Sequence, residues 1–186
     1  MATETKQPFV TALITDRNVA AISRSSPFLI RRLLRRLDLK NIRTLVELGP
    51  ADGVATRPIL QALSPEARLL AIENNHGFAE ALKKTADPRL EVIEGDARRL
   101  PEYLKQRGLT GVDAVIASIP FTYLSKEERF ALVAAAKEAL QPGGVFIIFH
   151  QYSWLMKPYV DKIFGKSWLE FEPLNIFPCF LMIGRK

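Results

Sequence analysis

The sequence is short of the residues that build covalent and metal-centred structures. One cysteine, Cys179, stands among 186 residues, which excludes an internal disulfide and is typical of a reducing compartment. The two histidines, His76 and His150, are too far apart in the sequence for the spacing of metal ligands, so we expect no metal site.

Long apolar runs are also missing. No stretch of about eighteen apolar residues is present, which excludes a membrane-spanning helix of the usual length. The N-terminal residues lack the basic and then apolar pattern of a signal peptide. We therefore expect a cytoplasmic protein.

What is present fits a single globular domain. Apolar residues make up 48% of the chain and charged residues 25%, and the length is sufficient to bury a sizeable core. The net charge of +6 favours anionic partners, such as nucleic acid or an acidic lipid surface.

The most informative segment is residues 44–53. An apolar strand containing Glu47 leads into a loop in which small residues alternate, at Gly49, Ala51 and Gly53. Small residues there let the backbone approach a nucleotide closely, but their spacing differs from the dinucleotide pattern. A carboxylate at this strand end would repel a pyrophosphate and could hold an ammonium group. The segment therefore predicts a site for a cationic nucleoside that carries an amino acid.

Three later segments repeat the pattern of an apolar strand with a polar end. The strand over 68–73 ends in Glu73, about twenty residues past the loop, where nucleotide-binding folds place a carboxylate for the ribose hydroxyls. The strand near 90–94 leads into Asp96, and the strand over 112–117 leads into residues 118–121. Each signal alone also fits an ordinary strand end. Their order and even spacing favour one nucleotide site.

Together these segments resemble class I S-adenosylmethionine-dependent methyltransferases. Residues 47–53 (Glu-Leu-Gly-Pro-Ala-Asp-Gly) are similar to motif I of that family, with Ala51 where glycine is usual, and the Leu-Gln-Pro-Gly-Gly turn at 140–144 is also typical. The resemblance implies a single Rossmann-like α/β domain. Residues 41–186 would form the S-adenosylmethionine-binding part, with a seven-stranded, mostly parallel sheet that has one antiparallel edge strand. Residues 1–40 would form a helical N-terminal extension of the same domain.

The resemblance also implies S-adenosylmethionine as cofactor. Glu47 would bind its ammonium group, Glu73 its ribose and Asp96 its adenine amino group. The expected cofactor-binding residues are Glu47, Gly49, Ala51, Asp52, Gly53, Glu73, Asn74, Asp96, Ala97 and Ser118.

Helices and strands are expected to alternate along the chain. The apolar patterns predict helices over 54–63, 76–86, 97–107 and 126–140, strands near 44–48, 68–72, 90–94, 112–117 and 144–149, and a closing strand pair at 168–172 and 176–183. Ser125 and Glu128 predict a capping box for the helix that starts at 126.

Residues 26–39 read as a basic amphipathic helix, with Ser26 as its cap and Pro27 at its first position. One face holds Phe28, Leu29, Ile30, Leu33, Leu34 and Leu37, and the other holds Arg31, Arg32, Arg35 and Arg36. The leucines either cover the sheet or enter a membrane surface, and both hold if the leucines pack inward while the arginines touch anionic headgroups. We expect peripheral contact with the inner face of the cell membrane through the arginines.

The segment Ser118-Ile119-Pro120-Phe121 bears on the methyl acceptor. Methyltransferases that act on the amino groups of adenine or cytosine resemble it but carry Asn or Asp where this chain has Ser118. A hydroxyl is a poorer acceptor for an aromatic amine, which argues against base methylation and makes nucleic acid the less favoured partner.

A closer resemblance covers nearly the whole chain. Residues 17–27, 47–54, 118–121 and 175–179 resemble the bacterial phospholipid N-methyltransferase group, which is similar in fold to ribosomal RNA adenine dimethyltransferases. The chain departs from the pattern at Arg24, Ala51 and Phe177. The resemblance implies N-methylation of an amine such as the phosphatidylethanolamine headgroup. RNA adenine N6-methylation and a non-catalytic cofactor-binding module stay open as alternatives.

The expected catalytic residues are Ser118, Tyr123, His150 and Tyr152. Tyrosine rings favour the positive charge that grows on the nitrogen, and His150 could relay a proton or be a core histidine. Tyr152 could also be a packing residue. The expected substrate-binding residues are Ile119, Pro120, Phe121, Asn175 and Pro178.

Overall fold

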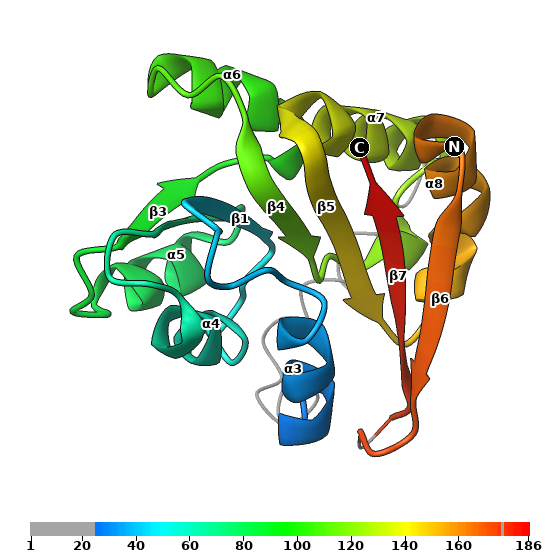
Figure 1. Ribbon diagram of the computed structural model, residues 1–186, viewed down its shortest axis with the longest axis horizontal. Coiled ribbons are helices and arrows are strands. Elements are labelled where there is room, and N and C mark those ends of the chain that lie inside the picture. The colour runs from blue at the N-terminus through cyan, green and yellow to red at the C-terminus, as the bar shows by residue number, and fades with distance from the viewer. Residues whose placement is uncertain (1–24, 176) are drawn as a thin grey trace, which may run out of the picture.

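A computed structural model describes residues 25–175 and 177–186 (Figure 1). They form a seven-stranded sheet in the order β3-β2-β1-β4-β5-β7-β6. The strands are β1 (Thr44–Leu48), β2 (Arg68–Glu73), β3 (Leu90–Glu94), β4 (Val112–Ala117), β5 (Leu140–His150), β6 (Ser167–Glu172) and β7 (Cys179–Arg185). The predicted α/β, Rossmann-like sheet is therefore confirmed, and so are the first five strands.

One detail of the predicted sheet is wrong. β7 is antiparallel to both β5 and β6, so it is the single antiparallel strand, but it lies inside the sheet and β6 forms the edge. The chain leaves β5, crosses over through a helix and lays β6 parallel to β5 with a gap of one strand between them. β7 then turns back from β6 and fills that gap.

Six helices are described: α3 (Pro27–Leu34), α4 (Thr56–Ala62), α5 (His76–Lys83), α6 (Leu100–Gln106), α7 (Lys126–Ala139) and α8 (Lys157–Phe164). Short 3-10 turns precede α6 (η1, Ala97–Arg99), α7 (η2, Phe121–Tyr123) and α8 (η3, Ser153–Met156). Side chains that alternate along the strands divide the core into two layers. α6, α7 and α8 cover one face of the sheet, while α3 and α4 cover the other.

The predicted capping box at the start of α7 is confirmed. The backbone N–H of Glu128 donates to the Ser125 hydroxyl at 3.1 Å, and the Ser125 N–H donates to the Glu128 carboxylate at 2.8 Å. The predicted helix over 97–107 starts instead as the 3-10 turn η1, and α6 begins at Leu100.

The apolar face of α3 packs against the sheet. Leu29, Ile30 and Leu33 are buried in the core layer shared with α4, and the Leu29 N–H donates to the Ser26 hydroxyl that caps the helix. Phe28 does not belong to this face, contrary to the prediction, because it points outward and remains exposed. Residues 1–24, where the other N-terminal helices and part of the family pattern were predicted, lie outside the described residues.

α3 lies at the end of the sheet toward which the arrowheads of β4 and β5 point (Figure 1). This is the carboxyl end of the parallel strands, where α/β sheets bind ligands. Within the described ranges, no helix is long and apolar enough to cross a membrane.

Candidate active site

The carboxyl ends of the central strands are tied together by backbone hydrogen bonds. The Gly49 N–H donates to the Ile72 carbonyl at 2.9 Å, and the Ser118 N–H donates to the Leu48 carbonyl at 3.0 Å. The Gly95 N–H donates to the Glu73 carbonyl at 2.9 Å. These bonds bring the predicted ends of β1, β2, β3 and β4 to one edge of the sheet.

The loop after β1 needs its small residues. Gly49 and Gly53 have φ values of +72° and +76°, and a Cβ on Gly53 would lie 2.8 Å from a methyl carbon of Leu82. Ala51 also has a positive φ, +49°, and is the single non-glycine residue of the described chain that does. The left-handed region is strained for alanine, which explains why glycine is usual at this position.

Glu47 is buried two residues before this loop. One of its carboxylate oxygens accepts a hydrogen bond from the Thr56 hydroxyl at 2.7 Å. The other oxygen has no hydrogen-bond partner among the described residues. Loss of hydration raises the pKa of Glu47 to about 7, the neighbouring charge of Glu73 adds to the effect, and the Thr56 bond opposes it. A buried carboxylate oxygen without a partner fits the ammonium group of the predicted cofactor.

Glu73 joins β2 to the loop after β1. One oxygen accepts the Ala51 N–H at 2.9 Å, and the other accepts the Asn75 N–H at 2.9 Å. Each oxygen keeps a lone pair that can accept a further hydrogen bond, as from a ribose hydroxyl. Asn74 is exposed beside it. Sequence reasoning missed Asn75, whose side chain caps α5 by accepting the Phe78 N–H, although an asparagine three residues before Phe78 was a usable signal.

Asp96 is held by an arginine that the sequence analysis did not include. The Arg98 guanidinium contacts both carboxylate oxygens of Asp96, at 3.0 and 2.9 Å from Nε and at 2.5 Å from Nη2. Arg98 also reaches Glu128 of α7 at 2.5 Å. The hydrogen bonds from Arg98 lower the pKa of Asp96, so this carboxyl is charged at neutral pH. Ala97 opens η1 directly after it, and the adenine contact of Asp96 stays a prediction.

Ser118 connects β4 to the same loop. Its hydroxyl donates to the Gly49 carbonyl at 2.7 Å. The hydroxyl proton is thus used within the protein, and Ser118 positions the loop. Ile119 is partly buried and Pro120 exposed, whereas Phe121 is fully buried in the core and shapes the strand end from within.

Two tyrosines and a histidine lie beside these residues, past the ends of β4 and β5. Tyr123 in η2 and Tyr152 before η3 are exposed, and η2 contacts η3. His150 is partly buried, and its ring lies 5.9 Å from the Tyr152 ring and 6.3 Å from that of Phe121. The structure therefore places His150 and Tyr152 side by side, and the turn that carries Tyr123 contacts the turn that follows Tyr152.

His150 is held in a defined state. Burial lowers its pKa, which favours the neutral ring at neutral pH. Its Nδ1 accepts the Tyr152 N–H at 3.3 Å, which in the neutral ring leaves the proton on Nε2. Nε2 is then a donor, an arrangement better suited to orienting an acceptor molecule than to removing its proton.

Asn175 and Pro178 lie further along, in the loop between β6 and β7. The Asn175 side chain is buried: its oxygen accepts the Ser26 N–H at 2.6 Å, and its nitrogen donates to the Phe177 carbonyl at 3.0 Å. This amide fixes the loop to the start of α3 and is not exposed to a substrate. Pro178 is exposed.

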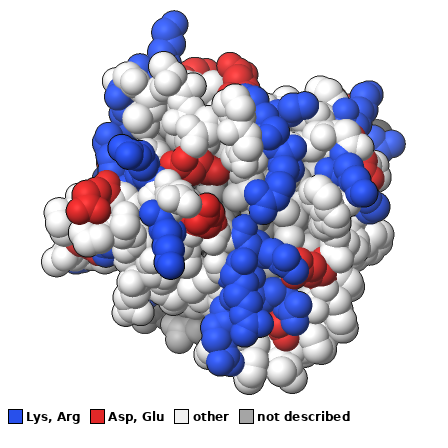
Figure 2. Space-filling view, in the orientation of Figure 1, with Lys and Arg blue, Asp and Glu red and all other residues white. Residues whose placement is uncertain are grey.

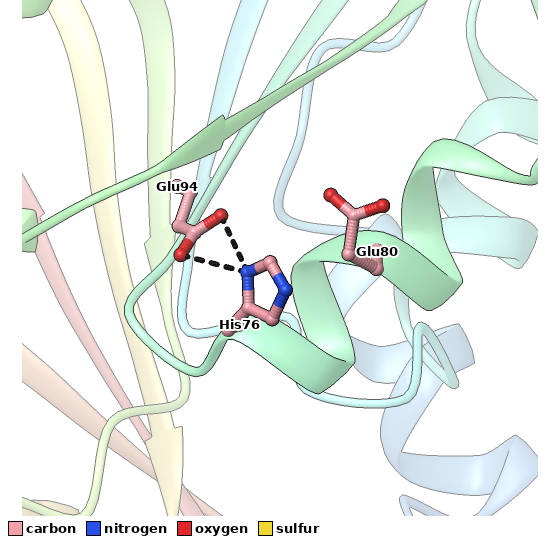
Figure 3. Close-up of side chains that lie close together, drawn as sticks. All are labelled: His76, Glu80 and Glu94. Atoms are coloured by element: carbon pink, nitrogen blue, oxygen red, sulfur yellow. Dashed lines mark hydrogen bonds and ion pairs between the residues drawn. The ribbon is translucent and has the colours of Figure 1, made fainter.

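The structure brings together one cluster that the sequence analysis did not anticipate. His76, Glu80 and Glu94 lie side by side, with ligand atoms within 4.8 Å of one another (Figure 3). His76 is already hydrogen-bonded to Glu94 at 3.1 Å and Glu80 to Lys83 at 2.8 Å. We assign no ion to this exposed cluster.

Comparison with known proteins agrees with this geometry. Residues 45–144, more than half of the chain, match the family described as a methyltransferase domain. The O-methyltransferase from Bacillus cereus, solved in complex with SAH, superposes with a TM-score of 0.74 at 16% identity, covering 100% of this chain and 93% of that one. The chain belongs to the class I S-adenosylmethionine-dependent methyltransferases, and S-adenosylmethionine is its cofactor.

Two curated relatives bear on the acceptor. The ornithine lipid N-methyltransferase of Singulisphaera acidiphila is 32% identical over 162 residues, which cover 86% of this chain and 84% of that protein. The probable ribosomal RNA small subunit methyltransferase A of Thermococcus kodakarensis is 32% identical over 126 residues, which cover 63% of this chain and only 43% of that protein.

Proposed function

We propose that this methyltransferase N-methylates the alkyl amine of a lipid headgroup. The observation that carries the proposal is the similarity, over 86% of the chain, to an ornithine lipid N-methyltransferase that is matched over 84% of its own length. Phosphatidylethanolamine and ornithine lipid both present such an amine.

The site is suited to an alkyl amine. S-adenosylmethionine, when bound, supplies a methyl group activated by its sulfonium. Glu47 and Glu73 would hold its ammonium group and ribose, and Asp96 its adenine. An alkyl amine is strongly nucleophilic once it is deprotonated, so the protein mainly has to orient it and exclude water. No strong base is required, which agrees with the donor state of His150 Nε2.

The exposed rings would serve the amine itself. Tyr123 and Tyr152 present aromatic faces and hydroxyls past the ends of β4 and β5. Such faces stabilise a cation, including the positive charge that develops on the nitrogen as the methyl group arrives. His150 Nε2–H would donate to an oxygen of the headgroup.

RNA base methylation is the second candidate, favoured by the similarity to the Thermococcus kodakarensis relative. An aromatic amine is a poor nucleophile and needs strong acceptors to orient its protons. Ser118 offers only a neutral hydroxyl oxygen for that task, which is a weaker acceptor than the side-chain oxygen of Asn or Asp.

One experiment separates the candidates. The purified full chain is incubated with methyl-labelled S-adenosylmethionine and, in parallel, with liposomes containing phosphatidylethanolamine, liposomes containing ornithine lipid, or total RNA. We expect label in the lipid fraction. Label confined to RNA, or in neither fraction, contradicts lipid methylation.

A further inference from the structure

The loop between β6 and β7 and the start of α3 form one continuous surface. The Ser26 N–H donates to Asn175 at 2.6 Å, and Arg32 pairs with Glu172 at 2.7 Å. Glu172 also accepts the Leu174 N–H at 3.0 Å. The contacts include a buried amide and a buried carboxylate, so the two segments are fixed relative to each other.

Three large apolar side chains point outward around the Ser26–Asn175 hydrogen bond. Phe28, two residues after Ser26, is 45% exposed, and Leu174 and Phe177, on either side of Asn175, are 58% and 47% exposed. Scattered single apolar residues on a surface are ordinary, but several gathered at one place mark an interaction site.

Among the described residues, Arg31 and Arg35 form no ion pair with a carboxylate, unlike Arg32 and Arg36. Arg32 and Arg36 are paired with Glu172 and Glu170 of β6, at 2.7 and 2.5 Å, and hold α3 to the sheet. Arg31 lies 4.8 Å over the Phe28 ring, and Arg35 is exposed. Figure 2 shows the resulting concentration of basic side chains over α3, with acidic side chains beside it.

The surface stands next to the active site. His150 at the end of β5 is paired in register with Phe180 of β7, and Phe180 is paired with Phe171 of β6. Neighbouring strands are about 4.8 Å apart, so Phe180 lies one strand spacing and Phe171 about two from His150. The β6–β7 loop starts two residues after Phe171 and ends two residues before Phe180.

We propose that Phe28, Leu174 and Phe177, flanked by Arg31 and Arg35, are the surface that docks on an anionic lipid bilayer. Apolar side chains beside arginines match the boundary between acyl chains and anionic headgroups. RNA phosphates would attract Arg31 and Arg35 but would gain nothing from the apolar side chain of Leu174. An anionic bilayer interacts favourably with the arginines and with the apolar side chain. The inference rests on the proposed function, because docking at this surface would bring lipid headgroups to Tyr152 and His150, where the amine would be methylated.

The test is vesicle flotation with the full chain, without S-adenosylmethionine. The vesicles contain either phosphatidylcholine alone or phosphatidylcholine with roughly one third of the anionic lipid phosphatidylglycerol. Leu174→Ser combined with Phe177→Ser is expected to lower binding to anionic vesicles at least about tenfold, because two apolar anchors are lost. Arg31→Gln combined with Arg35→Gln is expected to lower it by a similar factor and to remove the preference for anionic lipid.

Phe130→Ser is the matched control, since Phe130 is an exposed aromatic residue of α7 on the opposite face of the sheet. Unchanged binding of both double variants, an equal loss in the control, or no binding of the unaltered protein to either vesicle overturns the proposal. Methyl transfer to a short-chain, monomeric phosphatidylethanolamine is measured alongside. It is expected to be retained in the variants, and its absence in the unaltered protein would count against the proposed function and not against the docking surface.

Discussion

The carboxylate of Glu73 accepts the backbone N–H of Ala51 at 2.9 Å, which ties the end of β2 to the loop after β1. Its second oxygen accepts the Asn75 N–H. One buried side chain thus holds the strained turn of the cofactor loop in place and also presents oxygens at the expected position of the ribose.

Glu73→Gln should therefore weaken both the fold and the cofactor site. An amide has one acceptor oxygen, so one of the two backbone N–H groups loses its partner, at a cost of about 1–3 kcal/mol in the free energy of unfolding. Urea unfolding measures the loss, and calorimetry with S-adenosylmethionine measures the affinity. Glu94→Gln is the control, because Glu94 is the exposed register partner of Glu73 on β3. Equal effects in both variants would contradict the role of Glu73.

Ala51→Gly should be tolerated. Glycine removes the strain at φ +49° but adds conformational freedom to the unfolded chain, so the free energy of unfolding should change by less than about 1 kcal/mol. Ala51→Val should destabilise by more, because a β-branched residue fits this region poorly. Denaturant midpoints distinguish the two, and a glycine variant that fails to bind cofactor would be the contrary result.

Glu47→Gln should change how stability depends on pH. The pKa of Glu47 is raised in the folded protein from 4.5 to about 7, so the folded state holds its proton more tightly than the unfolded chain. Stability of the cofactor-free protein should therefore fall as pH rises from about 4.5 to 7 and level off above that. The glutamine variant escapes this loss, and at pH 8 it should be more stable by on the order of 3 kcal/mol.

The same substitution should weaken cofactor binding, because an amide does not attract an ammonium group as a carboxylate does. In the unaltered protein, affinity should decline as pH drops below about 7, where Glu47 takes up its proton. Thermal unfolding and calorimetry across pH 5–8 test both statements. A glutamine variant that is less stable at pH 8 and binds as tightly as before would refute the assignment.

Arg98→Ala should affect the cofactor more than the fold. The Arg98–Asp96 and Arg98–Glu128 pairs are substantially exposed, so their loss should cost less than about 1 kcal/mol. Asp96 would lose the partner that fixes its orientation, and we expect severalfold weaker S-adenosylmethionine binding. Arg99→Ala, which breaks the similar pair with Glu102, is the control and should leave affinity unchanged.

Tyr152 should act through its ring. Tyr152→Phe keeps the aromatic face and should retain most of the methyl transfer to lipid, whereas Tyr152→Ala should reduce the turnover about tenfold, since a cation–π contact is worth roughly 1–2 kcal/mol. Cofactor affinity, measured in parallel, should be the same in both. A phenylalanine variant as slow as the alanine variant would show that the hydroxyl, not the ring, is what matters.

Local chemistry made much of this site predictable. A close approach of the backbone to a ligand requires small residues, which predicted the turn at Gly49 and Gly53. A charged nucleoside calls for acidic side chains, which drew attention to the acid at each strand end. The capping box at Ser125 is likewise a short-range pattern. Such signals lie within a few residues of one another, so no knowledge of the tertiary fold is required.

The missed features depend on contacts between distant segments. The position of β7 inside the sheet follows from strand order, which no local pattern encodes. The burial of Asn175 depends on Ser26, 149 residues away, and the cluster of His76 with Glu94 depends on β2 and β3 being neighbours. Phe28 fits the helical spacing of the apolar residues in the sequence, but its side chain lies outside the surface of α3 that packs against the sheet.

A crystal structure with S-adenosylhomocysteine would test the central claim most directly. We expect the ammonium group of the ligand to lie against the Glu47 oxygen that has no partner among the described residues, directly or through one water, and its ribose hydroxyls to bond Glu73. A ligand bound away from the loop over residues 49–53, with no contact to that oxygen of Glu47, would contradict the account.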